Sequence, residues 1–165
     1  MSGRIIACLT DNDVTVYELK GAAFIERNRS SWSLSRTIAF FARRSAQDSL
    51  ITFLYAIRSD GIVITFVYNS AERGLQQLPD NSLGSDVITF VDPLPGRPRF
   101  FDEVWARFVS VSDHGKVMLW RRALRSDSRW TLETSLQLRP ESSIQRIAVS
   151  VDFTLALICM SPVVT

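Results

Sequence analysis

Residues 113–120 read Asp113-His114-Gly115-Lys116-Val117-Met118-Leu119-Trp120, and two earlier stretches follow the same eight-residue pattern. Each copy has a polar pair, then Asn or Gly, a variable residue, a Val, two further residues and an aromatic side chain. The other two copies are Thr10-Asp11-Asn12-Asp13-Val14-Thr15-Val16-Tyr17 and Ser59-Asp60-Gly61-Ile62-Val63-Ile64-Thr65-Phe66. Their final aromatic residues are 49 and 54 residues apart. A hairpin that recurs at such a period is typical of propellers and related arrays.

Short β-type runs separated by turn residues dominate the rest of the chain. The three copies lie in predicted hairpins that join residues 5–9 to 14–19, 50–57 to 62–68 and 107–111 to 116–122. Turn pairs such as Asp60-Gly61 suit the positive φ that tight hairpins need. Further strands are predicted over residues 22–26, 37–42, 75–78, 87–91, 130–138, 144–149 and 155–160. A polar turn is predicted over residues 43–48, and the prolines within residues 92–99 predict a loop. Each hairpin is therefore followed by an outer strand and then by an inner strand that leads to the next hairpin.

The composition indicates one folded domain without targeting or membrane segments. A chain of 165 residues can bury roughly 70% of its unfolded surface. Cys8 and Cys159 lie in apolar strand-like runs, which predicts buried free thiols rather than a disulfide framework. The five-residue apolar stretch near the N-terminus is too short for a signal peptide, and no apolar run reaches the length of a membrane span. We expect a soluble, intracellular protein of the cytoplasm or nucleus, without membrane insertion.

Residues 108–121 resemble the central hairpin of a WD40-type β-propeller. They combine a strand of small residues, an Asp-x-Gly turn and a strand that ends in Trp120. Residues 144–160 look like the inner strand, turn and next strand that follow. The resemblance implies an all-β fold of antiparallel four-stranded blades in a partial WD40-like β-propeller. We expect one partial propeller domain over residues 1–165, with blade equivalents at roughly 1–35, 36–85, 86–138 and, in part, 139–165.

The sequence departs from the family pattern in two respects. The family's Trp-Asp pair is Trp120-Arg121 here, and its Gly-His pair is absent because His114 is the only histidine. The family's buried His-Ser-Asp-Trp hydrogen-bond network therefore cannot be carried over, and packing is expected to hold the blades. A closed propeller needs at least about four blades, whereas this chain supplies about three. We expect a fragment of a longer protein, or a ring completed by another subunit or by self-association through open blade edges. Other antiparallel sandwiches or barrels are the alternative folds.

No combination of residues in the sequence indicates catalysis. His114 lies in a turn, no nucleophile-elbow motif occurs, and no phosphate-binding glycine loop is present. Neither cysteine has another Cys or a His at a metal-ligand spacing, and Asp11-Asn12-Asp13 lacks the Gly and Glu of a calcium loop. We therefore expect no enzymatic activity, no cofactor and no metal.

Two arginine-rich segments are the candidate partner-binding sites in a chain that has 17 Arg and only 2 Lys. The loop 92–105 combines arginine with aromatic residues, a composition enriched at interface hot spots. Its candidates are Arg97, Arg99, Phe100, Phe101 and Trp105. Alternatively, its three aromatic side chains fold back over a blade edge.

The second segment, 121–129, supplies Arg121, Arg122, Arg125 and Arg129, which could hold an acidic partner or a phosphate. Its alternative is a solvated loop. Reversing Arg122 and Arg125 to Glu is expected to leave folding intact.

These patterns favour a non-catalytic WD40-like scaffold for protein–protein interaction. The resemblance implies that such a scaffold is a subunit of a larger intracellular complex, with other proteins of a multi-subunit assembly as its partners. The alternative is a nucleic-acid-binding β module that uses the Arg-rich loops. Asp127 and the small net charge of +2 argue against that alternative.

Overall fold

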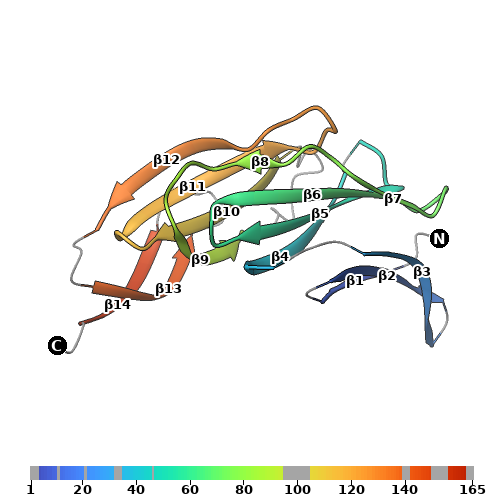
Figure 1. Ribbon diagram of the computed structural model, residues 1–165, viewed down its shortest axis with the longest axis horizontal. Coiled ribbons are helices and arrows are strands. Elements are labelled where there is room, and N and C mark those ends of the chain that lie inside the picture. Colours follow the sequence, from blue (N-terminus) through green and yellow to red (C-terminus); the bar gives the residue numbers. More distant parts are fainter. Residues whose placement is uncertain are drawn as a thin grey trace.

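Antiparallel β-strands form every regular element of the described part of the chain (Figure 1). The computed structural model describes residues 4–10, 12–20, 22–31, 35–45, 47–94, 105–138, 142–149 and 156–162. The strands before residue 80 are β1 (Arg4–Leu9), β2 (Asp13–Lys20), β3 (Ala23–Ser31), β4 (Thr37–Arg44), β5 (Ile51–Arg58), β6 (Ile62–Asn69) and β7 (Gly74–Gln77). The later strands are β8 (Asn81–Ser82), β9 (Ile88–Pro93), β10 (Trp105–Ser112), β11 (Lys116–Ala123), β12 (Thr131–Gln137), β13 (Ser142–Val149) and β14 (Ala156–Pro162).

Two of the four sheets contain the full predicted cycle of strands. One sheet has the order β4-β5-β6-β7, and the other has the order β9-β10-β11-β12. In the first sheet, β7 pairs with the end of β6 and the short strand β8 pairs with its start. In both sheets, the chain enters at one edge strand, forms the central hairpin and leaves along the opposite edge. The hairpin turns contain Gly61 at φ 76° and Gly115 at φ 73°. The positive φ explains why glycine occupies both positions.

The remaining strands form two smaller sheets. One sheet has the order β1-β2-β3, and the other consists of β13 and β14. The predicted hairpin between residues 5–9 and 14–19 is confirmed, because Leu9 pairs with Val14 and Arg4 pairs with Leu19. The last predicted hairpin is confirmed by the pairing of β13 with β14.

Some element boundaries differ from the sequence prediction. Residues 43 and 44 belong to β4 rather than to a turn, and the two-residue strand β8 was not predicted. Strand β9 continues into the predicted loop and includes Pro93. It tolerates proline there because β9 is an edge strand, where a missing N–H need not break the ladder. The rest of that loop, residues 95–104, lies outside the described residues.

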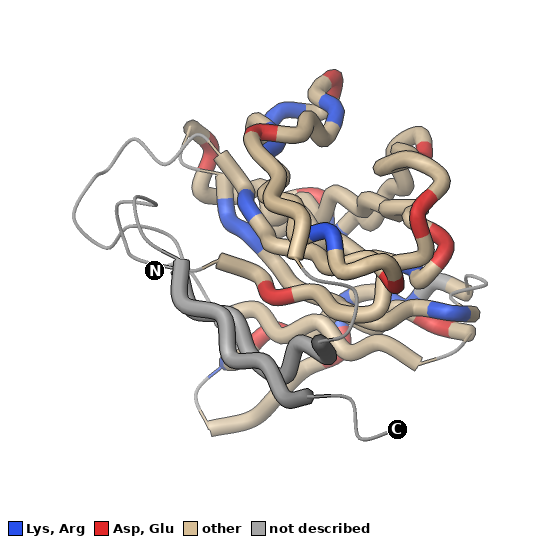
Figure 2. Tube along the Cα trace, turned by 90° about the vertical axis from the view of Figure 1, so that its left-hand side faces the viewer, with Lys and Arg blue, Asp and Glu red and all other residues tan. Residues whose placement is uncertain are grey.

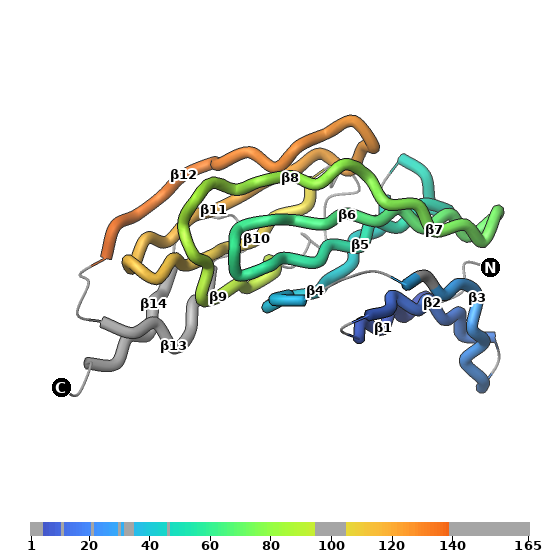
Figure 3. Tube along the Cα trace, in the orientation of Figure 1, coloured from blue at the N-terminus to red at the C-terminus, as the bar shows by residue number. Residues whose placement is uncertain are grey.

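The sheets pack face to face through side chains that alternate along their strands. In β5, Phe53, Tyr55 and Ile57 face β9–β12, where they join Phe108 and Trp120 in one buried cluster. The intervening Leu54 and Ala56 face β1–β3 and join a second cluster with Val14 and Val16. Strand β5 is therefore buried on both faces, which explains its almost continuous apolar sequence. In Figure 3 the sheets succeed one another in chain order, from the blue β1–β3 through β4–β7 to the orange β11 and β12.

Trp120 is held by a hydrogen bond as well as by packing. Its side chain is 6% exposed, and its Nε1–H donates to Ser110 Oγ over 2.9 Å inside the core. The expectation that packing alone holds the blades is therefore wrong for the hairpin of β10 and β11. The serine-to-tryptophan bond is possible because Ser110 and Trp120 lie on the same face of this hairpin.

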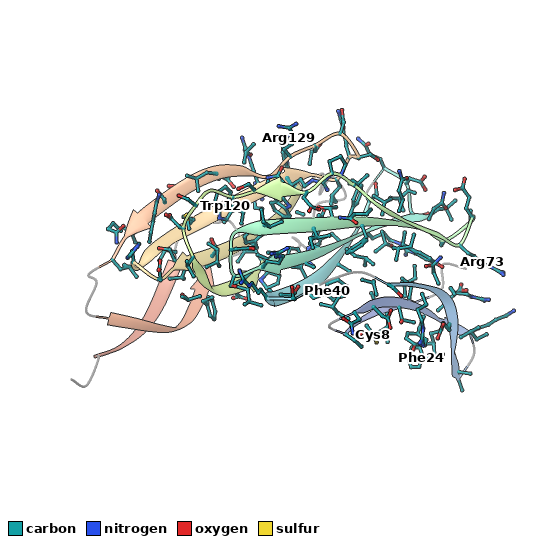
Figure 4. All side chains as sticks on the ribbon, in the orientation of Figure 1. Cys8, Phe24, Phe40, Arg73, Trp120 and Arg129 are labelled. Atoms are coloured by element: carbon teal, nitrogen blue, oxygen red, sulfur yellow. The ribbon has the colours of Figure 1, made fainter. Side chains whose placement is uncertain are left out.

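The prediction that both cysteines are buried is wrong for Cys8, which is an exposed free thiol. Alternation along β1 places Ala7 against the second cluster, so the next residue points away from it (Figure 4). The apolar run around Cys8 therefore covers both faces of β1, and only one of these faces is in the core. The side chain of Cys159 lies outside the described residues.

Candidate interaction site

Arg122 is a buried arginine between the two complete sheets, and its side chain is 3% exposed. Strand β11 continues past Trp120, so the two-residue period of a strand turns Arg122 toward the same face as Trp120. Its Nη1–H donates to the Tyr55 hydroxyl of β5 over 3.2 Å. The guanidinium carbon also lies 5.4 Å from the ring centre of Phe53 and 5.6 Å from that of Tyr55. Arg122 therefore joins two sheets from inside the protein, and the prediction that it lies in an exposed loop is wrong.

The same guanidinium anchors the connection between β11 and β12. Nε–H donates to the Ser128 carbonyl over 2.9 Å, and Nη2–H donates to the Arg125 carbonyl over 3.2 Å. The connection begins with buried Leu124 and ends with buried Trp130. Between these anchors, the side chains of residues 125–127 and of Arg129 are exposed, and Figure 4 labels Arg129 on this turn. This segment is therefore a fixed turn that presents two exposed arginines, Arg125 and Arg129.

A polar pocket of about 160 Å³ lies between this turn and the sheet of β4–β8. One wall comes from Thr65 of β6 and residues 78–81, and the other comes from Arg122 and residues 126–129. Asn81 connects the walls, because its Oδ1 accepts the backbone N–H of Trp130 over 3.3 Å. Two arginines and two aspartates line the pocket, namely Arg122, Arg129, Asp80 and Asp127. Their formal charges cancel.

Tyr55, the core residue that contacts Arg122, is itself strongly desolvated. Burial raises the pKa of Tyr55 to about 12, although the positive charge of Arg122 opposes the shift. Tyr55 is therefore a neutral phenol at physiological pH. It accepts the Arg122 hydrogen bond, and its ring packs edge-on against Trp130 at 5.1 Å between ring centres.

We expect the shifted pKa of Tyr55 to make the protein less stable in strong base. The folded state holds the phenolic proton up to about pH 12, whereas the unfolded chain releases it near pH 10. The contribution is therefore fully present below pH 10 and is lost as pH rises through this window. A shift of this size corresponds to about 2–3 kcal/mol in the free energy of unfolding. Denaturant titrations of the wild type and of Tyr55→Phe measure the effect, and the variant should show a smaller fall.

The neighbouring tyrosine does not disturb that comparison. Burial also raises the pKa of Tyr68, but Tyr68 is present in both proteins and its contribution cancels in the difference. Equal falls in stability for the wild type and Tyr55→Phe would contradict the assignment of the effect to Tyr55.

The other predicted candidates are distributed over different parts of the protein. Trp105 and Arg121 lie together on the opposite face of the β10–β11 hairpin from Arg122, with the Arg121 guanidinium 4.9 Å from the Trp105 ring centre. Glu133 of β12 joins them, with Oε1 3.8 Å from Arg121 Nη1 and Oε2 3.2 Å from Arg107 Nε. These contacts hold Trp105 and Arg121 within their own sheet. The candidates Arg97, Arg99, Phe100 and Phe101 lie outside the described residues.

Residues of the pocket that were not predicted come from distant parts of the chain. Asn81 belongs to β8 and Asp80 directly precedes it, while Tyr55, which contacts Arg122 beside the pocket, belongs to β5, and no local motif marks these residues. Within the described ranges, no group of three or more His, Cys, Asp or Glu side chains is arranged to hold a metal ion. The described residues also include no helix with the length and apolar character needed to cross a membrane.

Comparison with known proteins supports the architecture. No protein-family model and no curated protein sequence matches the chain. Among solved structures, the chain is similar to Saccharomyces cerevisiae Sqt1, with a TM-score of 0.51 and 13% sequence identity. The fold is that of a partial WD40-like β-propeller. The alignment covers 83% of this chain and 34% of the Sqt1 chain, so this chain spans about a third of the length of its structural neighbour. At this identity the likeness concerns the fold alone.

Proposed function

We propose that this chain is a non-catalytic protein-interaction scaffold within a larger intracellular assembly. The observation that carries the proposal is the anchored turn between β11 and β12, where buried Arg122 fixes the backbone carbonyls of Arg125 and Ser128. A turn held in this way presents Arg125 and Arg129 with little loss of backbone freedom on binding. Arginine is also enriched among the residues that dominate interface energies. A propeller fold supports many functions, so the proposal depends on this surface rather than on the fold.

Exposed apolar side chains on edge strands support a second contact with protein. Strand β12 forms one edge of its sheet, and its Leu136 is 54% exposed. Phe24 of β3, an edge strand of another sheet, is 55% exposed. Edge strands with exposed apolar residues can pair with another chain. The proposal therefore includes a partner subunit or self-association at these edges.

We expect charge reversal at the anchored turn to weaken partner capture without unfolding the protein. In affinity purification followed by quantitative mass spectrometry, the double variant Arg125→Glu with Arg129→Glu should co-purify at least tenfold less of a partner than the wild type does. Both side chains are exposed, so the thermal midpoint should change little. Arg44→Glu, a single reversal at an exposed arginine at the end of β4, controls for charge reversal elsewhere on the surface and should capture as the wild type does. Equal capture by the double variant would refute the role of this turn.

Nucleic-acid binding is the alternative use of the same arginines. Figure 2 shows acidic residues interspersed with basic ones along the described trace, rather than a continuous basic stripe. Such interleaving opposes the multiple phosphate contacts on which nucleic-acid affinity depends. Binding to RNA or DNA that weakens steeply with salt would favour the alternative, and no binding at low salt would remove it.

A further inference from the structure

The polar pocket between the two complete sheets contains a buried positive charge that no described carboxylate contacts. Arg122 is 3% exposed and lines the pocket. Among the residues that the structure describes, none places a carboxylate within 4.0 Å of its guanidinium. We infer that this pocket receives a single carboxylate side chain, Glu or Asp, from a partner protein. This inference rests on the proposed scaffold function and specifies the chemistry that the site recognises.

The hydrogen bonds of Arg122 leave part of its guanidinium available. A guanidinium has five N–H donors. Within the described residues, three of them meet acceptors, and all three acceptors are neutral: the Ser128 carbonyl, the Tyr55 hydroxyl and the Arg125 carbonyl. One N–H remains on each terminal nitrogen. Two such N–H groups can hold one carboxylate through paired hydrogen bonds.

Burial makes the arrival of a carboxylate favourable. A charged group removed from most of its water without an opposite charge in contact is costly. A carboxylate that enters the pocket places a negative charge in contact with Arg122, which its neighbours already hold in position. Little further ordering is then needed.

The size and charge of the pocket favour a carboxylate over a phosphate. A volume of about 160 Å³ accommodates one side chain but not a nucleotide. Asp80 and Asp127 line the same pocket, so a doubly charged phosphate would meet repulsion that a single negative charge meets less. Ser126 and Ser128 contribute hydroxyl groups that can donate to the carboxylate.

Two small molecules test the inference on the purified full chain. N-acetyl-L-glutamate α-amide carries one carboxylate, and N-acetyl-L-glutamine α-amide is its neutral isostere. In heteronuclear NMR titrations, the glutamate compound should shift the backbone amides of Ser126 and Ser128 and the Nε–H of Arg122 in a saturable manner. The glutamine compound should bind at least tenfold more weakly. The absence of saturable shifts, or equal affinity for the two compounds, would overturn the inference. Tighter binding of inorganic phosphate than of the glutamate compound would overturn the choice of a carboxylate.

A variant that fills the pocket locates the binding site without disturbing Arg122. Ser126 is exposed and makes no hydrogen bond within the part of the chain that the structure describes. Ser126→Phe should abolish the shifts, whereas Ser135→Phe, on exposed β12 outside the pocket, should retain them. Binding that survives in Ser126→Phe would refute the assignment to this pocket. Because the titration needs no partner, a failure here alongside intact partner capture would reject the carboxylate site and leave the scaffold proposal standing.

Discussion

Replacing Trp120 with alanine is expected to lower the free energy of unfolding by about 3–5 kcal/mol, the range typical of deleting a large buried aromatic side chain. The indole lies in the cluster between the two complete sheets and stacks on Phe108 with 6.4 Å between ring centres. Its removal leaves a cavity between the two sheets, and neither sheet can move to fill it without disturbing the packing of the other. The change also leaves the Ser110 hydroxyl without its hydrogen-bond donor. Equilibrium denaturation followed by circular dichroism measures the loss.

Two further variants separate the packing of Trp120 from its hydrogen bond. Trp120→Phe keeps an aromatic ring but removes the N–H donor, whereas Ser110→Ala removes only the acceptor. If the hydrogen bond of 2.9 Å between Trp120 and Ser110 stabilises the protein, either single change already removes it. The loss of unfolding free energy in the double variant should then be smaller than the sum of the two single losses. Leu50→Ala, at an exposed leucine, is the control and should change stability by no more than about 0.5 kcal/mol. Unchanged stability in Trp120→Ala would contradict the placement of Trp120 in the core.

The hairpins could be predicted from the sequence because their signals are local. Glycine in an Asp-x-Gly or Asp-Gly turn marks a backbone that needs positive φ, and Gly61 and Gly115 both adopt it. The aromatic residue five positions beyond each of these glycines falls at a buried position, Phe66 in one case and Trp120 in the other. The spacing of turn and aromatic residue therefore contained both the hairpin and one of its core contacts.

The pocket could not be predicted because its residues meet only in the folded chain. Arg122 looks like the start of a charged loop, although the alternation of Met118 and Trp120 continues to it along β11. That alternation was the available signal for its burial. Its acceptor Tyr55 is 67 residues away, and Asn81 belongs to a two-residue strand that no periodicity can reveal. Long-range pairing, rather than composition, decides that this arginine is internal.

Replacing Arg122 with glutamate is expected to destabilise the protein by about 3–5 kcal/mol, contrary to the expectation from the sequence, because it buries an unpaired negative charge and removes three hydrogen bonds. The carboxylate would lie among the Ser128 and Arg125 carbonyls and the Tyr55 hydroxyl, where it can donate nothing to the two carbonyls. Arg122→Met keeps much of the apolar stem and should cost less, about 2–4 kcal/mol, because it leaves two partly buried carbonyl oxygens and the buried Tyr55 hydroxyl without their donor. Denaturant midpoints and slopes for both variants measure these losses.

The neighbouring Arg125→Glu is the matched control for the same charge reversal. Its side chain is exposed, so stability should change by no more than about 0.5 kcal/mol. The two reversals lie three residues apart and alter net charge equally, so a difference between them reports burial rather than overall electrostatics. If Arg122→Glu were as stable as Arg125→Glu, the Arg122 side chain would have to lie in solvent, and the anchored turn would lose its physical basis. The expected contrast instead separates two positions within one arginine-rich segment, with Arg122 holding the turn from inside and Arg125 and Arg129 on its exposed surface.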